Sequence, residues 1–416
     1  MTEIRARYLV ETALNLEACA EAIAGEQSSG TFVAVPGEDA ALRARARARV
    51  VAIEEIDGTD APSLPGGRAM GGPVRRGYVE IAWPFANVGA SLPNLMSTVA
   101  GNLFELREIS GLKIMDIALP PPFFETHAGP AFGVAGTRRI SGVERRPLIG
   151  TIVKPSVGLS IEATADLVSG LAEAGIDFIK DDELQGDSPS SPFADRVRAV
   201  MDVLRRHADR TGKRVLYAFN ITGEVDEMRW RHDLVEREGG TCVMVSINSV
   251  GLAGVISLAR HSRLIIHGHR NGWGALSRHP VLGWSYVAWQ KFWRLAGVDH
   301  LHVNGLQNKF CESDESVLVS ARACLTPMSP AKPAVAMPVF SSGQTVRQVA
   351  DTWSQMGSSD LIFAAGGGVL GHPDGTRAGV EALQQAWDAA IAGVPVARHA
   401  AQHPPLARAL AAFDGA

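Results

Sequence analysis

The stretch "GIDFIKDDE", residues 175–183, places one lysine directly beside two aspartates and a glutamate. Its first half is apolar and reads as a buried strand, in which successive side chains alternate between two faces. Lys180 and Asp182 should therefore project to the same side, with Glu183 available where the strand begins to turn. Two carboxylates at this spacing can hold a hard cation such as Mg²⁺ through oxygen.

A protonated lysine beside such a cation would repel it. A lysine held neutral, or converted by CO₂ to an anionic carbamate, would instead complete the metal site. The alternative is a salt-bridge cluster on a solvated turn, which needs no metal. The ends of the other predicted strands bear on the choice between these two interpretations.

The elements that must position these groups form two series. From Arg146 onward, eight short apolar runs alternate with helical patterns. Eight strand-and-helix units over about 250 residues predict a (β/α)₈ TIM barrel and are favoured over a doubly wound open sheet. Before them, a β-α-β-β-α-β order predicts a ferredoxin-like α+β domain, with "PGEDAALRARA" and "TDAPSLPGGRAMGGPVRRG" as loops or insertions. We expect that domain at residues 1–125, a connector at 126–145 and the barrel at 146–416.

The active site of such a barrel lies at the carboxyl ends of its strands. Polar, cationic or glycine residues end seven of the eight runs, which favours a site over a surface salt bridge. Glycines after the last two runs leave backbone N–H groups open to a phosphate, and Arg270, His302 and Lys309 add groups for an anionic substrate. The residues at these ends are Lys154; Lys180, Asp182, Glu183; Asn220; His267, His269, Arg270; His300, His302, Asn304; Ser341, Ser342, Gly343; and Gly366, Gly367, Gly368.

Composition and charge narrow the class of protein. The formal net charge is −4 and arginines do not cluster beside aromatic residues, so no nucleic-acid footprint is evident. The first residues lack the apolar core of a signal peptide, and no run approaches a membrane-spanning length. The four cysteines are scattered without a C-x-x-C pair, which argues against a zinc site and predicts reduced thiols in the cytoplasm.

These motifs together resemble the RuBisCO large-chain family over most of the chain. "GIDFIKDDE" matches the segment around that family's carbamylated lysine. "GTIVKPSVGLS", "IIHGHR", "GVDHLHVNG", "PVFSSG" and "FAAGGGVLGHP" resemble its first, fifth, sixth, seventh and eighth barrel strands. "GEQSSGTF" and "GNLFELREISGLKIMDIALP" are similar to its N-terminal domain.

The resemblance implies a role for each matching residue. Lys180 would carry the CO₂ carbamate and hold Mg²⁺ together with Asp182 and Glu183, while Lys154 would move the substrate proton. Lys309, on the loop after the sixth strand, and His269 would also be catalytic. The other implied residues bind anions or reach the site of a neighbouring subunit, which implies at least a homodimer: Arg270, His302 and Ser341 at one phosphate; Gly343, Gly366, Gly367 and Thr31 at the other anion site; Glu26 and Asn102 in the neighbour's site.

Four positions depart from the carboxylating members of the family. Ser156 stands where a second lysine follows the first strand, and Trp273 stands where a histidine is expected. Cys311 replaces a glutamate of the loop after the sixth strand, and Ala364 replaces a glutamine. The metal and enolisation groups are intact, whereas groups that steer CO₂ are altered. The chain is therefore similar to RuBisCO-like proteins, which keep the enolate chemistry without net CO₂ fixation.

The resemblance implies a Mg²⁺-dependent enzyme that forms an enediolate from a phosphorylated keto sugar or sugar acid. We expect decarboxylation of a 3-oxo sugar acid phosphate of the 3-oxo-isoapionate 4-phosphate type, because loss of CO₂ leaves the same enediolate that carboxylation would attack. The alternatives are a methylthioribulose-phosphate isomerase or enolase of methionine salvage, a residual ribulose-bisphosphate carboxylase, against which Ser156 argues, and a non-catalytic protein that kept the fold.

Overall fold

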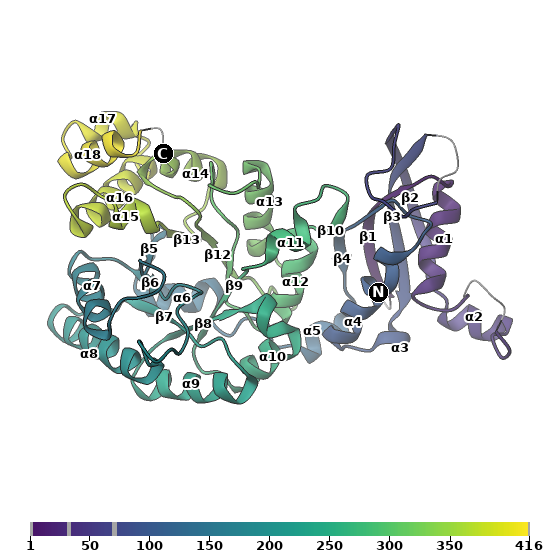
Figure 1. Ribbon diagram of the computed structural model, residues 1–416, viewed down its shortest axis with the longest axis horizontal. Coiled ribbons are helices and arrows are strands. Elements are labelled where there is room, and N and C mark those ends of the chain that lie inside the picture. Colours follow the sequence, from purple (N-terminus) through teal and green to yellow (C-terminus); the bar gives the residue numbers. More distant parts are fainter. Residues whose placement is uncertain (1–2, 31–34, 69–72, 415–416) are drawn as a thin grey trace. The chain divides into compact units, whose positions relative to one another are not determined.

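The computed structural model describes residues 3–30, 35–68 and 73–414 (Figure 1). The chain divides into two compact units, Met1–Ala128 with Gly272–Ala296, and Gly129–Asn271 with Gly297–Ala416. The later segment of the first unit falls inside the range expected for the barrel alone. No helix among these residues is long and apolar enough to cross a membrane.

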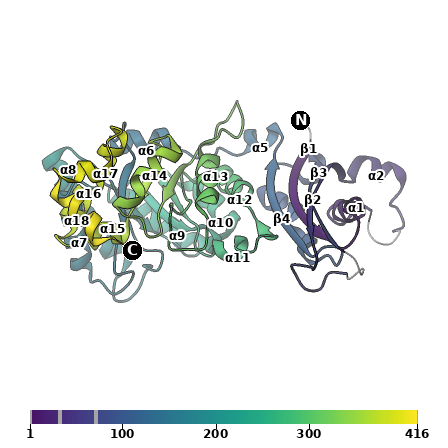
Figure 2. The same ribbon diagram turned by 90° about the horizontal axis from the view of Figure 1, so that it is seen from above.

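The first unit contains a five-stranded sheet in the order β10-β4-β1-β3-β2. β1 pairs antiparallel with β3 and β4, and β2 pairs antiparallel with β3, as in the predicted ferredoxin-like α+β fold. The helix α1 packs on β1, β2 and β3 (Figure 2). β10 adds a parallel strand beside β4, pairing Leu282 with Leu112, and this addition was not predicted.

The elements of the first unit up to β4 follow the predicted order, but both expected loops need correction. The segment "TDAPSLPGGRAMGGPVRRG" includes the start of β3, which begins at Val74. The segment "PGEDAALRARA", expected as a loop or insertion, contains the helix α2, whose first turn is capped by Asp39. The elements are β1 (Glu3–Thr12), α1 (Leu16–Glu26), α2 (Ala40–Ala46), β2 (Arg49–Thr59), β3 (Val74–Pro84), α3 (Phe85–Val88), α4 (Leu92–Val99), η1 (Gly101–Glu105), β4 (Gly111–Ala118), α5 (Pro121–Thr126), α11 (Trp273–Ser277), β10 (Leu282–Trp284) and α12 (Tyr286–Ala296).

The second unit is a closed parallel barrel, which confirms the predicted fold class. The strands pair in the order β11-β12-β13-β5-β6-β7-β8-β9, and β9 closes onto β11. All eight apolar runs chosen from the sequence form these strands, which are β5 (Leu148–Ile152), β6 (Phe178–Lys180), β7 (Leu216–Asn220), β8 (Cys242–Ser246), β9 (Ile265–His269), β11 (His300–His302), β12 (Met337–Phe340) and β13 (Ile362–Ala364).

Helices surround the barrel, as Figure 1 shows for α7 to α10. Ser160 and Ser313 cap α7 and α13 by accepting a backbone N–H of the first turn. The helices of this unit are α6 (Gly133–Ser141), α7 (Ile161–Glu173), α8 (Phe193–Thr211), α9 (Val225–Arg237), α10 (Ile247–His261), α13 (Asp314–Leu325), η2 (Val346–Gln348), α14 (Val349–Met356), α15 (Gly366–Leu370), α16 (Thr376–Ile391), α17 (Val396–Ala400) and α18 (Pro404–Ala412).

Alternate residues of the strands fill the barrel interior. Leu216 and Ala218 of β7 and Met337 and Val339 of β12 belong to one buried cluster, together with Phe178 of β6. Because side chains on a strand alternate, the residues two positions after these interior residues lie on the same face, higher in the barrel. This alternation directs Lys180, two residues after Phe178, into the mouth of the barrel.

Asp299 connects the start of α6 to the barrel strand β9. Its side chain is fully buried. One carboxylate oxygen accepts the backbone N–H groups of Phe132 and Gly133 at 2.7 and 2.8 Å, and the other accepts that of Ile266 at 2.8 Å. The buried carboxylate therefore satisfies three backbone N–H donors from two separate segments.

We expect Asp299→Asn to lower the free energy of unfolding by about 1–3 kcal/mol, because the new amide nitrogen must face a backbone N–H donor. Denaturant unfolding of the full chain measures this. Asp388→Asn, at an exposed position on α16, is the matched control and should leave the unfolding midpoint unchanged. Equal midpoints for both variants would contradict the proposed role of Asp299.

Candidate active site

Lys180 is the last residue of β6, and its amine is buried. Its side chain is 1% exposed, and its Nζ donates to the Asp181 carbonyl oxygen at 2.8 Å and lies 3.6 Å from Glu183 Oε2. Burial lowers the pKa of Lys180 below its ordinary value, although the nearby carboxylates of Glu183 and Asp182 oppose that shift. The neutral amine, which is the form that can react with CO₂, is therefore more accessible on Lys180 than on a solvated lysine.

Asp182 faces the same side as Lys180. It contacts Lys154, which lies just after the end of β5. Lys154 Nζ lies 2.5 Å from Asp182 Oδ2 and donates to Ser156 Oγ at 2.7 Å. Burial by itself raises the pKa of Asp182, but the hydrogen bonds from Lys154 and from the Leu184 backbone N–H bring it below the ordinary value. Asp182 is therefore ionised and next to the predicted proton-transfer residue.

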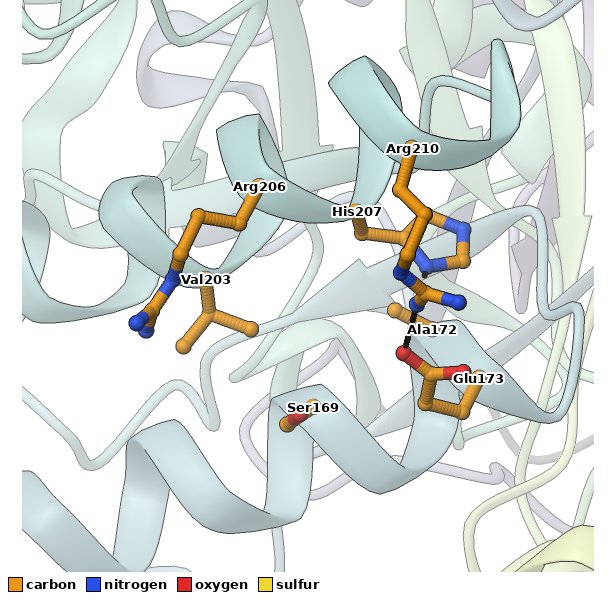
Figure 3. Close-up of a pocket in the computed structure, with 7 residues that line it drawn as sticks. All are labelled: Ser169, Ala172, Glu173, Val203, Arg206, His207 and Arg210. Atoms are coloured by element: carbon orange, nitrogen blue, oxygen red, sulfur yellow. Dashed lines mark hydrogen bonds and ion pairs between the residues drawn. The ribbon is translucent and has the colours of Figure 1, made fainter.

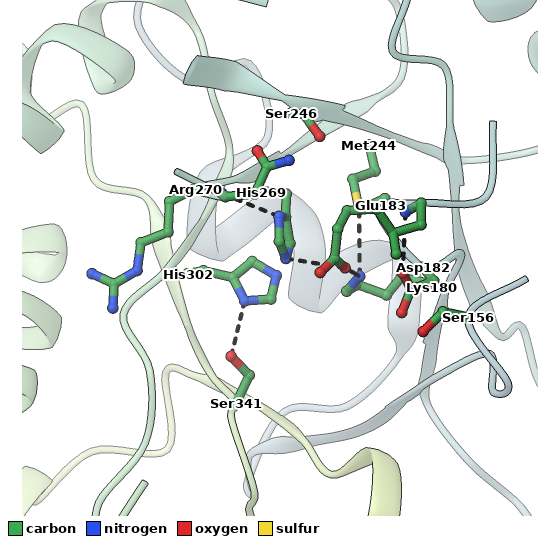
Figure 4. Close-up of polar contacts among 12 residues, drawn as sticks. Ser156, Lys180, Asp182, Glu183, Met244, Ser246, His269, Arg270, His302 and Ser341 are labelled. Atoms are coloured by element: carbon green, nitrogen blue, oxygen red, sulfur yellow. Dashed lines mark hydrogen bonds and ion pairs between the residues drawn. The ribbon is translucent and has the colours of Figure 1, made fainter. Parts of the chain in front are cut away.

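The residues fit the predicted Mg²⁺ site by their donor chemistry. Glu183 Oε2 lies 3.5 Å from His269 Nε2 and 3.6 Å from Lys180 Nζ, so this carboxylate faces the buried amine (Figure 4). Mg²⁺ prefers oxygen ligands, which Asp182 and Glu183 supply and a carbamate on Lys180 would extend. The alternative salt-bridge interpretation placed these groups on a solvated turn, whereas Lys180 and Asp182 are buried.

Asp181, between two predicted metal ligands, points the other way. Its Oδ1 accepts from Tyr217 Oη at 2.5 Å, and its Oδ2 accepts the backbone N–H of Asn220 at 2.9 Å. Arg196 of α8 lies 3.5 Å from the same Oδ2, and both charged side chains are fully buried. Asp181 therefore ties the end of β6 to β7 and α8.

A chain of hydrogen bonds runs from Ser341 into the barrel through three buried histidines. The contacts are Ser341 Oγ to His302 Nδ1 (3.0 Å), His302 Nε2 to His267 Nε2 (2.7 Å), His267 Nδ1 to His300 Nδ1 (3.3 Å) and His300 Nε2 to Thr137 Oγ1 (2.8 Å). Burial lowers the pKa of each of these imidazoles, to about 3 for His300. All three rings are therefore neutral, with one N–H each.

The direction of this chain follows from its inner end. Thr137 Oγ1 lies 2.5 Å from the Gly133 carbonyl oxygen, so the hydroxyl proton is donated to that carbonyl. Thr137 Oγ1 must then accept from His300 Nε2–H. This leaves His300 Nδ1 as an acceptor, to which His267 Nδ1–H donates. His302 consequently donates its only N–H to His267, and its Nδ1 accepts the hydroxyl proton of Ser341.

Arg270, predicted to bind a phosphate, pairs with a glutamate of the loop after β11. Arg270 Nη2 lies 2.6 Å from Glu312 Oε2, which also accepts from Asn304 Nδ2 at 2.7 Å. Asn304 and Ser342 both have positive φ angles, 65° and 71°, and the Ser342 hydroxyl donates to Asn304 Oδ1 at 2.8 Å. The sequence analysis did not single out Glu312, and no periodic pattern there signals its position.

Of the remaining residues predicted at the barrel mouth, Lys309 and Gly343 are neighbours, and Gly366 and Gly367 lie in another segment. Lys309 has an exposed side chain near the Phe310 ring, and its backbone N–H donates to the Ser342 carbonyl oxygen. A Cβ placed on Gly343 would lie 3.5 Å from the Lys309 side chain, so these two residues are neighbours. Gly366 and Gly367 begin α15, directly after β13.

Three of the predicted residues, Glu26, Thr31 and Asn102, belong to the first unit. Glu26 ends α1 and Asn102 lies in η1, both on the surface, and Thr31 falls outside the described residues. Their predicted role in a neighbouring subunit stays a prediction. Trp273 is buried within the first unit against Trp289, and the Cys311 side chain is exposed.

Two other polar groups lie away from the strand ends. The hollow between α7 and α8 in Figure 3 has two arginines that each pair with a carboxylate, Arg206 with Asp202 and Arg210 with Glu173. His261 Nε2 and His232 Nδ1 both contact Asp233 Oδ1, at 2.6 and 3.0 Å. The Arg263 backbone N–H donates to His232 Nε2, whereas a metal-binding imidazole normally donates its second N–H. We therefore interpret His232, Asp233 and His261 as a hydrogen-bonded triad and not as a metal site.

Comparisons with known proteins cover nearly the whole chain. The family model for the ribulose bisphosphate carboxylase large chain, catalytic domain, matches residues 133–413, and that for its N-terminal domain matches residues 2–123. A 3-oxo-isoapionate-4-phosphate transcarboxylase/hydrolase from Xanthobacter autotrophicus is 57% identical over 98% of each chain. A 3-oxo-isoapionate-4-phosphate decarboxylase from Rhizobium rhizogenes is 44% identical over 98% of this chain and 97% of its own. The crystal structure of a rubisco-like protein from Burkholderia fungorum is 47% identical, covers 99% and 100% of the two chains, and has a TM-score of 0.94.

Asp181 and Glu183 of "KDDE" point to different surroundings, so we expect their substitution to affect different properties, stability and Mg²⁺ binding. Asp181→Asn should lower the free energy of unfolding by about 3–5 kcal/mol, because it leaves the buried Arg196 charge unpaired. Glu183→Gln, at a part-exposed position, should change stability by less than about 1 kcal/mol but weaken Mg²⁺ binding at least about tenfold. Denaturant unfolding and calorimetric Mg²⁺ titration in bicarbonate measure the two effects. Wild-type Mg²⁺ affinity in Glu183→Gln, or wild-type stability in Asp181→Asn, would contradict the assignment.

Proposed function

The chain belongs to the RuBisCO large-chain family, and on that premise we propose that it removes the carboxylate of a phosphorylated 3-oxo sugar acid, 3-oxo-isoapionate 4-phosphate, with Mg²⁺ as cofactor. The observation that carries the proposal is the buried Lys180, which faces Glu183 and lies on the same side as Asp182, beside Lys154. Relatives with 57% and 44% identity are named for this substrate.

The proposed metal centre begins with chemistry on Lys180. Its neutral amine attacks CO₂ and loses one proton, which leaves an anionic carbamate where a cation would otherwise be buried. This exchange removes the repulsion between Lys180 and a metal cation and adds oxygen donors beside Glu183 and Asp182. When bound there, Mg²⁺ would polarise the substrate carbonyl as a Lewis acid.

The reaction follows from the position of the substrate oxo group. In a 3-oxo acid the carbonyl lies β to the carboxylate, so the electron pair of the breaking C1–C2 bond moves to C2 and is stabilised as an enolate on the C3 oxygen. CO₂ leaves, and C2 must then gain one proton. Lys154, whose side chain is 44% exposed and held by Asp182 and Ser156, is the proposed donor and is reprotonated from water.

A second outcome for the carboxyl group is favoured by the 57% identical relative, whose name is transcarboxylase/hydrolase. For this chain, that outcome would mean that the CO₂ lost from C2 adds to C3 of the same enediolate while the C2 hydroxyl loses its proton and becomes a carbonyl. Water would then cleave the C2–C3 bond, so the carbon stays in an organic carboxylate and is not released as CO₂. Both outcomes use the same metal ligands and Lys154, so the fate of C1 is what separates them.

The other activities have less support. Ser156, which stands where carboxylating members carry a lysine, accepts a hydrogen bond from Lys154. Position 156 therefore offers a neutral hydroxyl and not a second cation that could attract or retain CO₂, which disfavours a carboxylase. Methylthioribulose-phosphate isomerisation remains an alternative for the same metal centre. A non-catalytic role is disfavoured by the intact Lys154, Lys180, Asp182 and Glu183.

The assembly and location of the protein are also proposed. We infer a homodimer in which Glu26 and Asn102 complete the neighbour's site, supported by their surface positions and by the family resemblance. Thr31 and the glycines Gly343, Gly366 and Gly367 would bind the substrate phosphate. The four cysteines are free, in keeping with a cytoplasmic location.

We expect the purified chain with Mg²⁺ and bicarbonate to convert 3-oxo-isoapionate 4-phosphate labelled with ¹³C at C1. Release of the label as CO₂ or bicarbonate in the NMR spectrum identifies a decarboxylase. Label in a new organic carboxylate identifies the transcarboxylase/hydrolase outcome. Because Lys180→Ala cannot form the carbamate, it should lower turnover at least about a hundredfold, roughly 2.7 kcal/mol of transition-state stabilisation.

Two results would contradict this function. One is an unchanged substrate in the presence of a folded, Mg²⁺-binding protein. The other is turnover by Lys180→Ala at the wild-type rate. Methylthioribulose 1-phosphate and ribulose 1,5-bisphosphate, tested in parallel, would then distinguish the isomerase and carboxylase alternatives.

Carbamate formation on Lys180 should depend on pH in a defined direction. Only the neutral amine reacts with CO₂, so carbamylation rises with pH until it passes the folded pKa of Lys180 and then levels off. Since burial lowers that pKa, the plateau should begin below pH 10.5, where a solvated lysine is still half protonated. The carbamate ¹³C signal in labelled bicarbonate measures this. A signal that keeps rising through pH 10.5, or that persists in Lys180→Ala, would contradict it.

A further inference from the structure

The side chains of Arg270, Glu312, His302 and Ser341, here called the Arg270 subsite, already include an anion of the chain itself. Arg270 and Glu312 are 6% and 15% exposed, with Nη2 and Oε2 2.6 Å apart. Arginine is permanently protonated in proteins, so its charge is the fixed cation of the subsite. Glu312 balances that charge at the place where a substrate phosphate would otherwise pair.

Glu312 is anchored at both carboxylate oxygens. Asn304 Nδ2 donates to Oε2 at 2.7 Å, and Ser316 Oγ donates to Oε1 at 2.8 Å. Asn308 Nδ2 also donates to the Glu312 backbone carbonyl at 3.0 Å, which fastens the loop on either side. A phosphate that pairs with Arg270 Nη2 and Asn304 Nδ2 would have to displace the Glu312 carboxylate, which already occupies both donors.

His302 and Ser341, the two other members of the subsite, already donate their protons to protein acceptors. In the directed hydrogen-bond chain, His302 donates its ring N–H to His267 and Ser341 donates its hydroxyl proton to His302. Neither can donate to a phosphate oxygen while that chain is intact. Ser341 Oγ instead presents acceptor lone pairs, which suit a substrate hydroxyl.

The charge balance leads to the same conclusion. Burial lowers the pKa of His302 and keeps its ring neutral, so the subsite carries one positive and one negative charge. A phosphate dianion placed there would be desolvated beside a charge pair that has no net positive charge to balance it, which is unfavourable. A neutral, hydroxyl-bearing group meets no such cost and can donate to Ser341 Oγ.

We propose that Glu312 is a specificity-determining residue that excludes a second phosphate from the Arg270 subsite, so that the site accepts sugar monophosphates and rejects bisphosphates. The proposal rests on the proposed function, because 3-oxo-isoapionate 4-phosphate carries one phosphate. That phosphate lies at the glycine end, with Gly343, Gly366 and Gly367, and the hydroxyl-bearing end of the substrate lies at the Arg270 subsite. The family resemblance predicts a phosphate at each end, and in this structure the Glu312 carboxylate occupies the Arg270 end.

Calorimetric binding of ribulose 5-phosphate and ribulose 1,5-bisphosphate to the full chain, with Mg²⁺ and bicarbonate, tests the proposal without any turnover. For the wild type, the second phosphate should improve the dissociation constant by less than about threefold. In Glu312→Gln, which frees the Arg270 charge, the bisphosphate should bind at least about tenfold tighter, in line with one charge-assisted arginine–phosphate pair. The monophosphate constant should change by less than about twofold.

Two matched variants separate charge from loop structure. Glu315→Gln, exposed in the first turn of the same helix α13, should leave both constants unchanged. Glu312→Asp keeps the negative charge and should keep the wild-type preference. Equal tightening for both ligands in Glu312→Gln, or none for the bisphosphate, would overturn the proposal. So would a wild type that binds the bisphosphate tenfold tighter than the monophosphate, a result that needs no variant to fold.

These outcomes are independent of the reaction itself. If the labelled 3-oxo-isoapionate 4-phosphate is not converted but Glu312→Gln gains bisphosphate affinity, the proposed function fails and the role of Glu312 stands. If the substrate is converted but Glu312→Gln gains no bisphosphate affinity, only the role of Glu312 fails.

Discussion

The buried carboxylate of Asp181 accepts hydrogen bonds from Tyr217 and the Asn220 backbone and pairs with Arg196, and the geometry of the site depends on this outward-facing interaction. A strand end is free to twist unless something holds it, and β6 is only three residues long. Because successive side chains alternate, fixing Asp181 on the outside directs Lys180 and Asp182 into the barrel mouth. Arg196 belongs to α8, so one helix of the outer layer contributes to the position of the proposed metal ligands.

Because most charged groups at the site are buried, they need partners of opposite charge. Lys154 pairs with Asp182 and Arg270 pairs with Glu312, while His267, His300 and His302 share their protons along a single directed chain. Lys180 lies 3.6 Å from Glu183, but its burial lowers its pKa and opposes the protonated form. Lys180 is the member of the set whose charge the proposed chemistry changes, because a carbamate would make it an anion. The proposed chemistry uses that change.

Two segments differ from the sequence prediction, one for a local reason and one for a long-range reason. Residues 40–46 follow Pro36 and Gly37 and were expected as part of a loop, yet the neighbouring Asp39 side chain caps a short helix there. Residues 272–296 were assigned to the barrel by their place in the chain, but β10 extends the sheet beside β4 and Lys291 pairs with Asp116. Neither the strand pairing nor the ion pair can be inferred from spacing, because the partners lie more than a hundred and fifty residues apart.

The sequence by itself determined the fold class and the identity of the groups that gather at the barrel mouth. Short apolar runs rich in Val, Ile and Phe specify strands, regular alternation with helices specifies a closed parallel barrel, and such a barrel collects its strand ends on one rim. Family resemblance then assigned Lys180, Asp182 and Glu183 to a metal centre. Only the tertiary structure decided which neighbours these groups and the rest of the rim have. Asp181 turns away to Arg196, Glu312 pairs with Arg270, and Ser341 donates to His302. Such pairings depend on the distances between side chains from different strands and loops, and a linear sequence does not contain those distances.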